Sequence, residues 1–173
     1  MPNWCNGVLK VRGKKKDLLK FLNEQLERRG FPFDDLKDDY STYDLNVETD
    51  EFGDIFVEHT DEEHFSWLYF KDSRRCFVET DIDWHWNTDD EVDLEEEYIQ
   101  CLDIKQAWRL EPDYFKEISL KYNIDFKTIG IEKGCCFSQK LEIVKGEIIS
   151  YLEGDYETRQ EFEWEVYDPR LGG

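Results

Sequence analysis

Carboxylates at alternating positions are the feature of this sequence most suited to chemistry. Two rows of three recur at every second residue: Glu79, Asp81 and Asp83, and then Glu161, Glu163 and Glu165. On a β-strand, side chains two residues apart share a face and lie about 6.5 Å apart. That spacing is comparable to the distance between successive phosphates along a nucleic-acid strand. The rows therefore predict a mimic of a phosphate backbone, with an ordinary solvated strand face as the alternative.

The overall charge points to the same kind of partner. The chain has 42 acidic and 22 basic residues, so its net charge is −20. Residues 38–63 hold eleven acids and no base, residues 79–97 hold ten acids and no base, and residues 153–168 hold seven acids and one base. Such a chain repels phosphates and anionic membranes and attracts basic surfaces. We expect a basic nucleic-acid-binding protein as partner, with no direct nucleic-acid or membrane binding. Acidity that serves only solubility is the alternative.

Aromatic side chains border the second acidic block and could anchor a protein interface. Tryptophan often dominates the binding energy of such interfaces, although core packing is the alternative for each one. The predicted partner-binding residues are Glu79, Asp81, Asp83, Trp84, Trp86, Asp89, Asp90, Glu91, Asp93, Glu95, Glu96, Glu97, Glu161, Glu163 and Glu165.

Metal-assisted hydrolysis is a second class of function that the sequence leaves open. Carboxylates and histidines gather in two places: Asp81, Asp83 and His85, and then Glu58, His59, Asp61, Glu63 and His64. Such groups can bind divalent ions, but neither spacing matches a familiar metal motif. The sequence also lacks a P-loop, a G-x-S-x-G elbow and a G-x-G-x-x-G turn. We expect no catalytic residue, no metal and no cofactor, and keep a metal-dependent hydrolase or nuclease as the alternative.

Cysteines and lysines contribute less specific signals. The five cysteines are odd in number and form no C-x-x-C, which argues against a disulfide scaffold or a structural zinc site. Their apolar neighbours predict that most are reduced core thiols. Lys14, Lys15 and Lys16 mark a solvated helix start, with pairing to an acidic block or self-association as alternatives.

The elements that would position these groups follow from hydrophobic periodicity and turn residues. Helices are predicted over residues 15–29, with a stop at Gly30, and after Pro112. Strands are predicted over residues 4–12, 43–48, 54–58, 65–71, 75–84, 99–108, 125–132 and 135–144, with a final hairpin whose arms are 146–152 and 159–167. Two helices among many strands predict helices packed on an antiparallel or mixed sheet.

The opening Met1-Pro2-Asn3-Trp4-Cys5-Asn6, followed by a strand, a glycine and a leucine-rich helix, resembles the YubB-like ferredoxin-like domain family. The layout stays similar through Trp84, Trp86 and the hairpin around Gly134, over roughly residues 1–150. The resemblance implies a split βαββαβ fold and an origin on a phage or another mobile element. It supplies no catalytic residues.

These observations together predict a single α+β domain over residues 1–173. Its ferredoxin-like core spans about 1–150, with additional strands and a C-terminal β-hairpin extension at about 146–167. The opening residues show no basic-then-apolar leader, and no apolar run approaches the roughly 20 residues of a membrane span. We expect a non-enzymatic protein of the bacterial host cytoplasm that inhibits a CRISPR or restriction effector by nucleic-acid mimicry. An acidic adaptor domain without mimicry is a further alternative.

Overall fold

The computed structural model describes residues 3–30, 42–44, 47–49, 55–57, 66–79, 83–84 and 94–166, with side chains for 3–27, 68–79 and 94–166. The three helices are α1 (Lys15–Gln25), α2 (Pro112–Tyr122) and α3 (Arg159–Glu165). The strands are β1 (Trp4–Lys14), β2 (Leu26–Gly30), β3 (Thr42–Asp44), β4 (Val47–Thr49), β5 (Ile55–Val57), β6 (Ser66–Phe70), β7 (Cys76–Val78), β8 (Asp83–Trp84), β9 (Glu97–Ala107), β10 (Asp125–Glu132), β11 (Phe137–Val144) and β12 (Glu147–Asp155).

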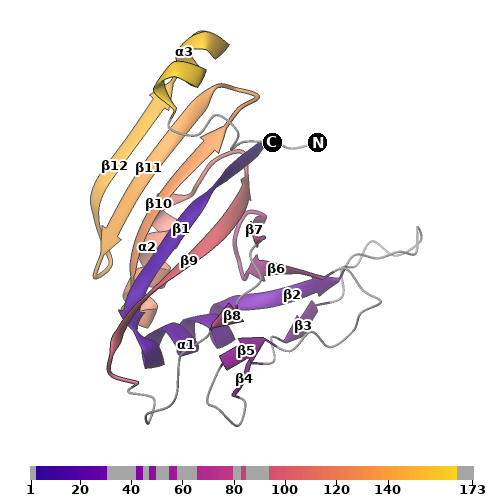
Figure 1. Ribbon diagram of the computed structural model, residues 1–173, viewed down its shortest axis with the longest axis vertical. Helices are drawn as coiled ribbons and strands as arrows, with labels where there is room; N and C mark the ends of the chain where they lie inside the picture. Colours follow the sequence, from indigo (N-terminus) through magenta and orange to yellow (C-terminus); the bar gives the residue numbers. More distant parts are fainter. Residues whose placement is uncertain are drawn as a thin grey trace.

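One large twisted sheet organises the molecule (Figure 1). Its nine strands run in the order β12-β11-β10-β1-β9-β7-β6-β2-β3, and a small second sheet has the order β4-β5-β8. Every strand pair in the described residues is antiparallel, including β1 with β9 at the centre. In a βαββαβ fold the strand that follows the first helix lies directly beside the strand that precedes the second helix, whereas here β7 and β6 separate β2 from β9. The predicted ferredoxin-like α+β core is therefore wrong, and the described residues form mainly an antiparallel sheet with three short helices.

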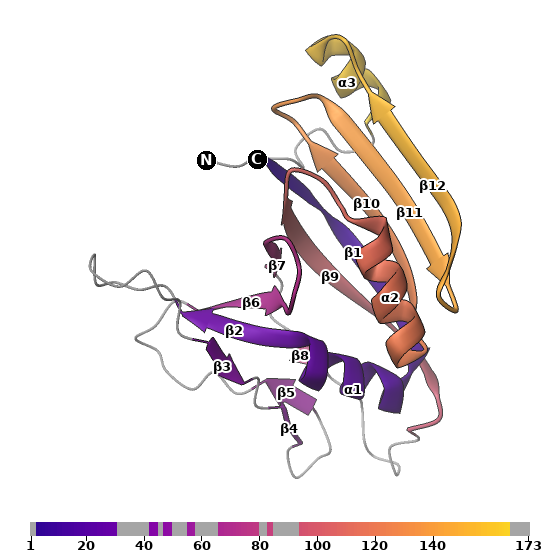
Figure 2. The ribbon, with the colours of Figure 1, turned by 180° about the vertical axis from the view of Figure 1, so that it is seen from behind.

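Buried and exposed side chains alternate along β1, so one face of the sheet is covered and the other is open. Cys5, Leu9 and Val11 are buried, whereas Lys10 and Arg12 are exposed. The buried set packs with apolar side chains of α1 and α2, such as Phe21 and Phe115, in one continuous core. Figure 2 shows α2 in front of the sheet, and α2 contacts β10, β11 and β12. Both long helices therefore lie on one face.

Close approach of backbones at the sheet centre requires a glycine. A Cβ atom on Gly7 would lie 1.9 Å from the carbonyl oxygen of Ile129. Gly7 pairs with Gly130 on one side and Ile104 on the other, so β1 cannot shift away. A side chain at this position is therefore incompatible with the sheet.

The two long helices begin where the sequence predicts, but α1 ends early. Lys15 starts α1, and Pro112 occupies the first turn of α2, where its missing N–H costs nothing. The predicted helix over 15–29 is wrong after Gln25, because Leu26 turns into extended backbone and pairs with Phe70 of β6. Tertiary pairing thus ends α1 five residues before the glycine.

The C-terminal hairpin arm is the second correction to the predicted elements. Residues 159–165 form α3 and not the predicted strand over 159–167. The Thr158 hydroxyl caps this helix by accepting from the Glu161 N–H at 3.2 Å. Phe162 and Val166, four residues apart, are buried against Ile131 of β10. Thr158 and Glu161 have the spacing of a capping box, a sequence signal that predicts a helix start here.

Candidate protein-binding edge

The first predicted acidic row is only partly within the described residues. Glu79 follows β7, is exposed, and lies 3.5 Å from Lys105 in an ion pair. Asp83 and Trp84 form β8, which pairs with β5 in the small sheet, but their side chains lie outside the described residues. Asp81, the remaining member of this row, lies outside the described residues. So do five other predicted partner-binding residues: Trp86, Asp89, Asp90, Glu91 and Asp93. The mimicry prediction for this row stays a prediction.

The second predicted row does not exist as a row. Glu161, Glu163 and Glu165 are exposed but lie on α3, where side chains two residues apart point about 200° away from each other. Glu163 accepts from Arg159 one turn earlier, at 2.9 Å. Glu161 and Glu165, four residues apart, therefore share one face of the helix while Glu163 lies on the opposite side, and the three do not follow the spacing of a nucleic-acid strand.

The third group of predicted residues is occupied within the molecule. Lys14 pairs with Glu95 at 2.7 Å, Lys15 pairs with Glu96 at 2.5 Å, and Lys16 also contacts Glu95. The Lys15 N–H donates to the Glu96 carbonyl at 3.0 Å, so this segment also caps the start of α1. Hydrogen bonds from Lys14 and Lys16 lower the pKa of Glu95 to about 2. The predicted alternative, in which the lysine cluster pairs with an acidic block, is therefore confirmed for Glu95 and Glu96. Glu97 is exposed and begins β9, where it lies opposite Lys14.

A large group of exposed acidic residues lies on β12 and α3, which we call the β12–α3 edge (residues 147–165). Seven acids and one base give it a net charge of 1 − 7 = −6. All seven carboxylate residues are exposed: Glu147, Glu153, Asp155, Glu157, Glu161, Glu163 and Glu165. This edge borders the sheet on one side and carries α3 at its end (Figure 1).

Apolar side chains interrupt this acidic edge. Trp164 is 86% exposed, Leu152 62% and Ile149 58%. Sequence periodicity places Trp164 on the same face as Phe162 and Val166, but the helix buries those two residues and directs Trp164 to solvent. An exposed tryptophan ringed by carboxylates is typical of a protein interface. Sequence reasoning missed Ile149, Leu152 and Trp164, because strand alternation alone does not identify an edge strand.

A buried glutamine holds β12 in place. Gln139 on β11 is fully buried, and its amide group donates to the Tyr151 hydroxyl at 2.7 Å and to Glu153 at 3.3 Å. Its carbonyl oxygen accepts from the Leu110 N–H at 2.8 Å, which ties the loop before α2 to the same network. Arg109 adds a 3.1 Å contact with Glu153. The edge is therefore preorganised on the sheet.

The α3 end of the edge packs on the face of the sheet that α1 and α2 leave open. Phe162 is fully buried, contacts Tyr156 edge to face at 5.7 Å and belongs to a small cluster with Ile131 and Val166. The Tyr156 N–H donates to the Cys136 carbonyl at 3.0 Å. These contacts fix the helix while leaving its carboxylates and Trp164 in solvent.

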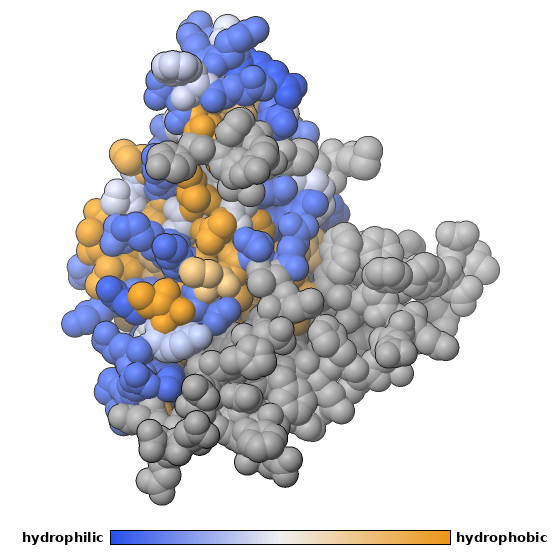
Figure 3. Space-filling view, in the orientation of Figure 1, coloured by the Kyte–Doolittle hydropathy of each residue, from blue (hydrophilic) through white to orange (hydrophobic). Residues whose placement is uncertain are grey.

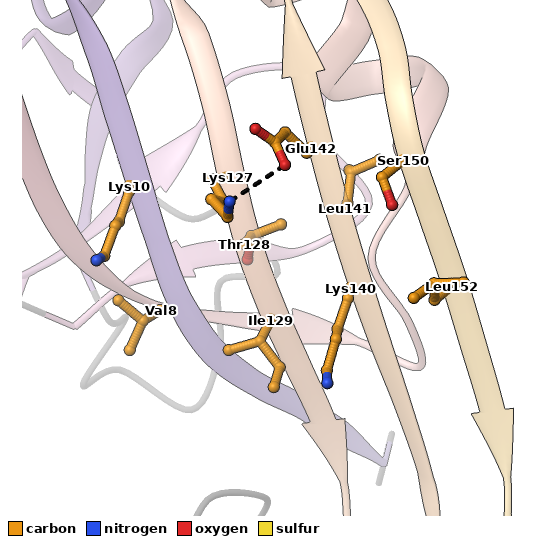
Figure 4. A pocket seen from close by; sticks show the side chains of 10 residues that line it. All are labelled: Val8, Lys10, Lys127, Thr128, Ile129, Lys140, Leu141, Glu142, Ser150 and Leu152. Carbon is orange, nitrogen blue, oxygen red and sulfur yellow. Dashed lines mark hydrogen bonds and ion pairs between the residues drawn. The ribbon is translucent and has the colours of Figure 1, made fainter. Parts of the chain in front are cut away.

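The open face also carries a groove with a local positive charge (Figure 4). It has a volume of about 340 Å³ and an apolar floor that includes Val8, Ile129 and Leu152. Lys127 pairs with Glu142 across the groove at 3.1 Å. Lys10 and Lys140 form no ion pair with any residue in the part of the chain that the structure describes. Figure 3 shows apolar and polar side chains interspersed over this face.

The five cysteines are divided between the core and the surface. All five cysteines are free, and only Cys5 and Cys76 are buried, so the prediction that most are core thiols is wrong. Burial raises the pKa of Cys5 to about 12, and a hydrogen bond with Glu132 raises the pKa of Cys135. Neither thiol is activated for nucleophilic attack.

Metal ligands do not gather in the described residues either, where no three His, Cys, Asp or Glu side chains are placed to hold an ion. The side chains of the two clusters proposed from the sequence lie outside the described residues. Ligation at those positions stays a prediction.

Comparisons with known proteins provide no relative for this chain. No family model, no curated protein and no solved structure matches it. The resemblance to the YubB-like family therefore stays a prediction. No helix in the described part of the chain is long and apolar enough to cross a membrane.

Proposed function

We propose that this chain is a non-catalytic binding protein whose β12–α3 edge docks on a basic surface of a nucleic-acid-handling protein. The observation that carries the proposal is an exposed Trp164 together with seven acidic residues on one preorganised edge, of which only Glu153 is held by the Gln139 network. Acidic rims accelerate encounter with basic partners, and a central aromatic side chain supplies affinity after desolvation.

A nucleic-acid-binding groove is the partner surface that fits this charge best, because such grooves are the commonest large basic surfaces. The proposal requires complementary charge but no regular phosphate spacing, since Glu161 and Glu165 lie on one face of α3 and Glu163 lies on the opposite side. Inhibition of a host CRISPR or restriction effector follows if the groove that is blocked belongs to one. That part of the proposal draws on the resemblance to mobile-element proteins.

Capture from a bacterial lysate at about 50 mM and about 300 mM salt tests this proposal. The wild-type chain is compared with a variant in which Glu161, Glu163 and Glu165 become glutamine. A control variant neutralises Asp113, Glu117 and Glu24, three exposed carboxylates on α1 and α2, and so changes the net charge equally.

We expect wild type and control to retain the same nucleic-acid-binding protein at low salt. The α3 variant should bind that purified protein about tenfold more weakly, since each rim charge contributes roughly 0.5 kcal/mol. Equal binding by both variants, or capture with no nucleic-acid-binding protein in it, contradicts the proposal.

A further inference from the structure

Strand β12 is the long outer strand of the sheet. It has nine residues, whereas β3 at the opposite end has three. It pairs with β11 along one side, and no other strand of the described residues pairs with it (Figure 2). An outer strand presents a row of unpaired N–H and C=O groups, which is a template for adding another strand.

The usual protections of such an edge are weak on β12. Residues 147–155 contain no proline, lysine or arginine. An irregularity in register between Glu142 and Ile143 affects the start of the strand, but Ser150–Asp155 pair regularly with β11. Ile149, Tyr151 and Leu152 are each at least 40% exposed. From Ser150 onward β12 is a regular outer strand with exposed apolar side chains, and such an edge is a site for β-strand addition.

A second copy of this chain is a poor occupant of the edge. Antiparallel pairing of two β12 strands centred on Tyr151 would place Glu147 opposite Asp155, and Ile149 opposite Glu153. Like charges directly opposite each other destabilise a strand pair, and each copy also has a net charge of −20. Charge complementarity instead favours a basic strand from a different protein.

We propose that β12 binds an extended segment of the partner by β-augmentation. The segment has an apolar residue beside Leu152 on one face of the sheet and another beside Ile149 on the other face, with lysine or arginine at the end that lies beside Asp155 and α3. This inference rests on the proposed function and specifies how the partner is held. Backbone pairing supplies affinity along the strand, and the acidic end fixes its direction.

Selection of displayed peptides tests the mode of binding directly. A random library of peptides about nine residues long is selected on the immobilised full-length chain. The same selection is run on an edge variant, Ile149→Gln with Leu152→Gln, which removes the apolar contacts without changing charge. Each residue of an enriched peptide is then N-methylated in turn, which removes one backbone donor while keeping its side chain.

We expect enriched peptides to be basic at one end, to carry apolar residues on both faces of the added strand, and to bind the edge variant about tenfold more weakly. N-methylation should weaken binding about tenfold at every second residue and by less than about twofold between them. Bound peptide should also slow amide exchange in β12.

Other outcomes separate this inference from the proposed function. Basic peptides that bind without a two-residue period, and equally to the edge variant, overturn β-augmentation and leave the proposed function standing. Enrichment of no basic peptide overturns both. Concentration-dependent dimers with slowed β12 exchange in the absence of peptide overturn the choice of occupant, since a second copy would then cover the edge.

Discussion

Replacing Gln139 with alanine should destabilise the fold more than any exposed polar substitution. Gln139 is fully buried, and its carbonyl oxygen is the acceptor for the Leu110 N–H at 2.8 Å. Leu110 is only 1% exposed, so water cannot replace this acceptor readily. A buried donor without a partner costs about 2 kcal/mol, and the cavity left by the side chain adds about 1 kcal/mol. The expected loss in the free energy of unfolding is about 3 kcal/mol.

Urea denaturation followed by tryptophan fluorescence measures this loss. With an m-value of about 2 kcal/mol/M, the midpoint should fall by about 1.5 M. Gln100→Ala is the matched control, because Gln100 lies on β9 and makes only an exposed bond to the neighbouring Cys101 carbonyl. That control should change stability by less than about 0.5 kcal/mol.

Two further measurements distinguish the network from the cavity. The Tyr151→Phe variant keeps the hydrogen bond between Leu110 and Gln139, so its free energy of unfolding should fall by only about 1 kcal/mol. The Leu110 amide should exchange faster in Gln139→Ala than in wild type or in Tyr151→Phe. Equal stabilities of Gln139→Ala and Gln100→Ala would refute the role assigned to this network.

Three other predictions concern separate parts of the molecule. Hydrogen bonds from Lys14 and then Lys16 lower the pKa of Glu95 from 4.5 to about 2, so the ionised carboxylate stabilises the fold above about pH 4.5 and this stabilisation is lost as the pH falls towards 2. In an NMR titration, the midpoint of Glu95 should be higher in Lys14→Gln than in wild type, and an unchanged midpoint contradicts the pairing. A thiol reagent should modify exposed Cys101 in the native protein but leave buried Cys5 unmodified until the chain unfolds, and equal rates would contradict the sheet assignment. Gly7→Ala should lower stability by more than about 3 kcal/mol in thermal or chemical unfolding, whereas a shift below about 1 kcal/mol would show that β1 can move away from Ile129.

Local patterns in the sequence predict the elements whose ends are set by local chemistry. Alternation along residues 4–12 predicts β1, Pro112 predicts the start of α2, and Gly134 marks the turn between β10 and β11. The concentration of acid after residue 153 is also evident from the sequence. Each of these signals involves neighbours along the chain, so no tertiary contact is needed to read them.

Residues 159–167 show why periodicity alone can fail. Phe162, Trp164 and Val166 satisfy a strand period, while Phe162 and Val166 also satisfy a helical one. On the open face of β10, Ile131 packs against Phe162 and Val166, which lie one helical turn apart on α3. Tertiary packing therefore selects the helix and turns Trp164 and the three carboxylates outward.

The amino-acid sequence by itself determined the total charge, the alternation of β1 and the start of each long helix, because these depend on composition and local spacing. Only the tertiary structure decided how strands distant in sequence pair, and hence that β12 is an outer strand. It also decided that Glu95 meets Lys14, 81 residues away, so that its charge is paired within the molecule. The physical reason is that strand pairing and ion pairing join distant segments, whose encounter is set by the whole sheet and leaves no periodic signal in either segment.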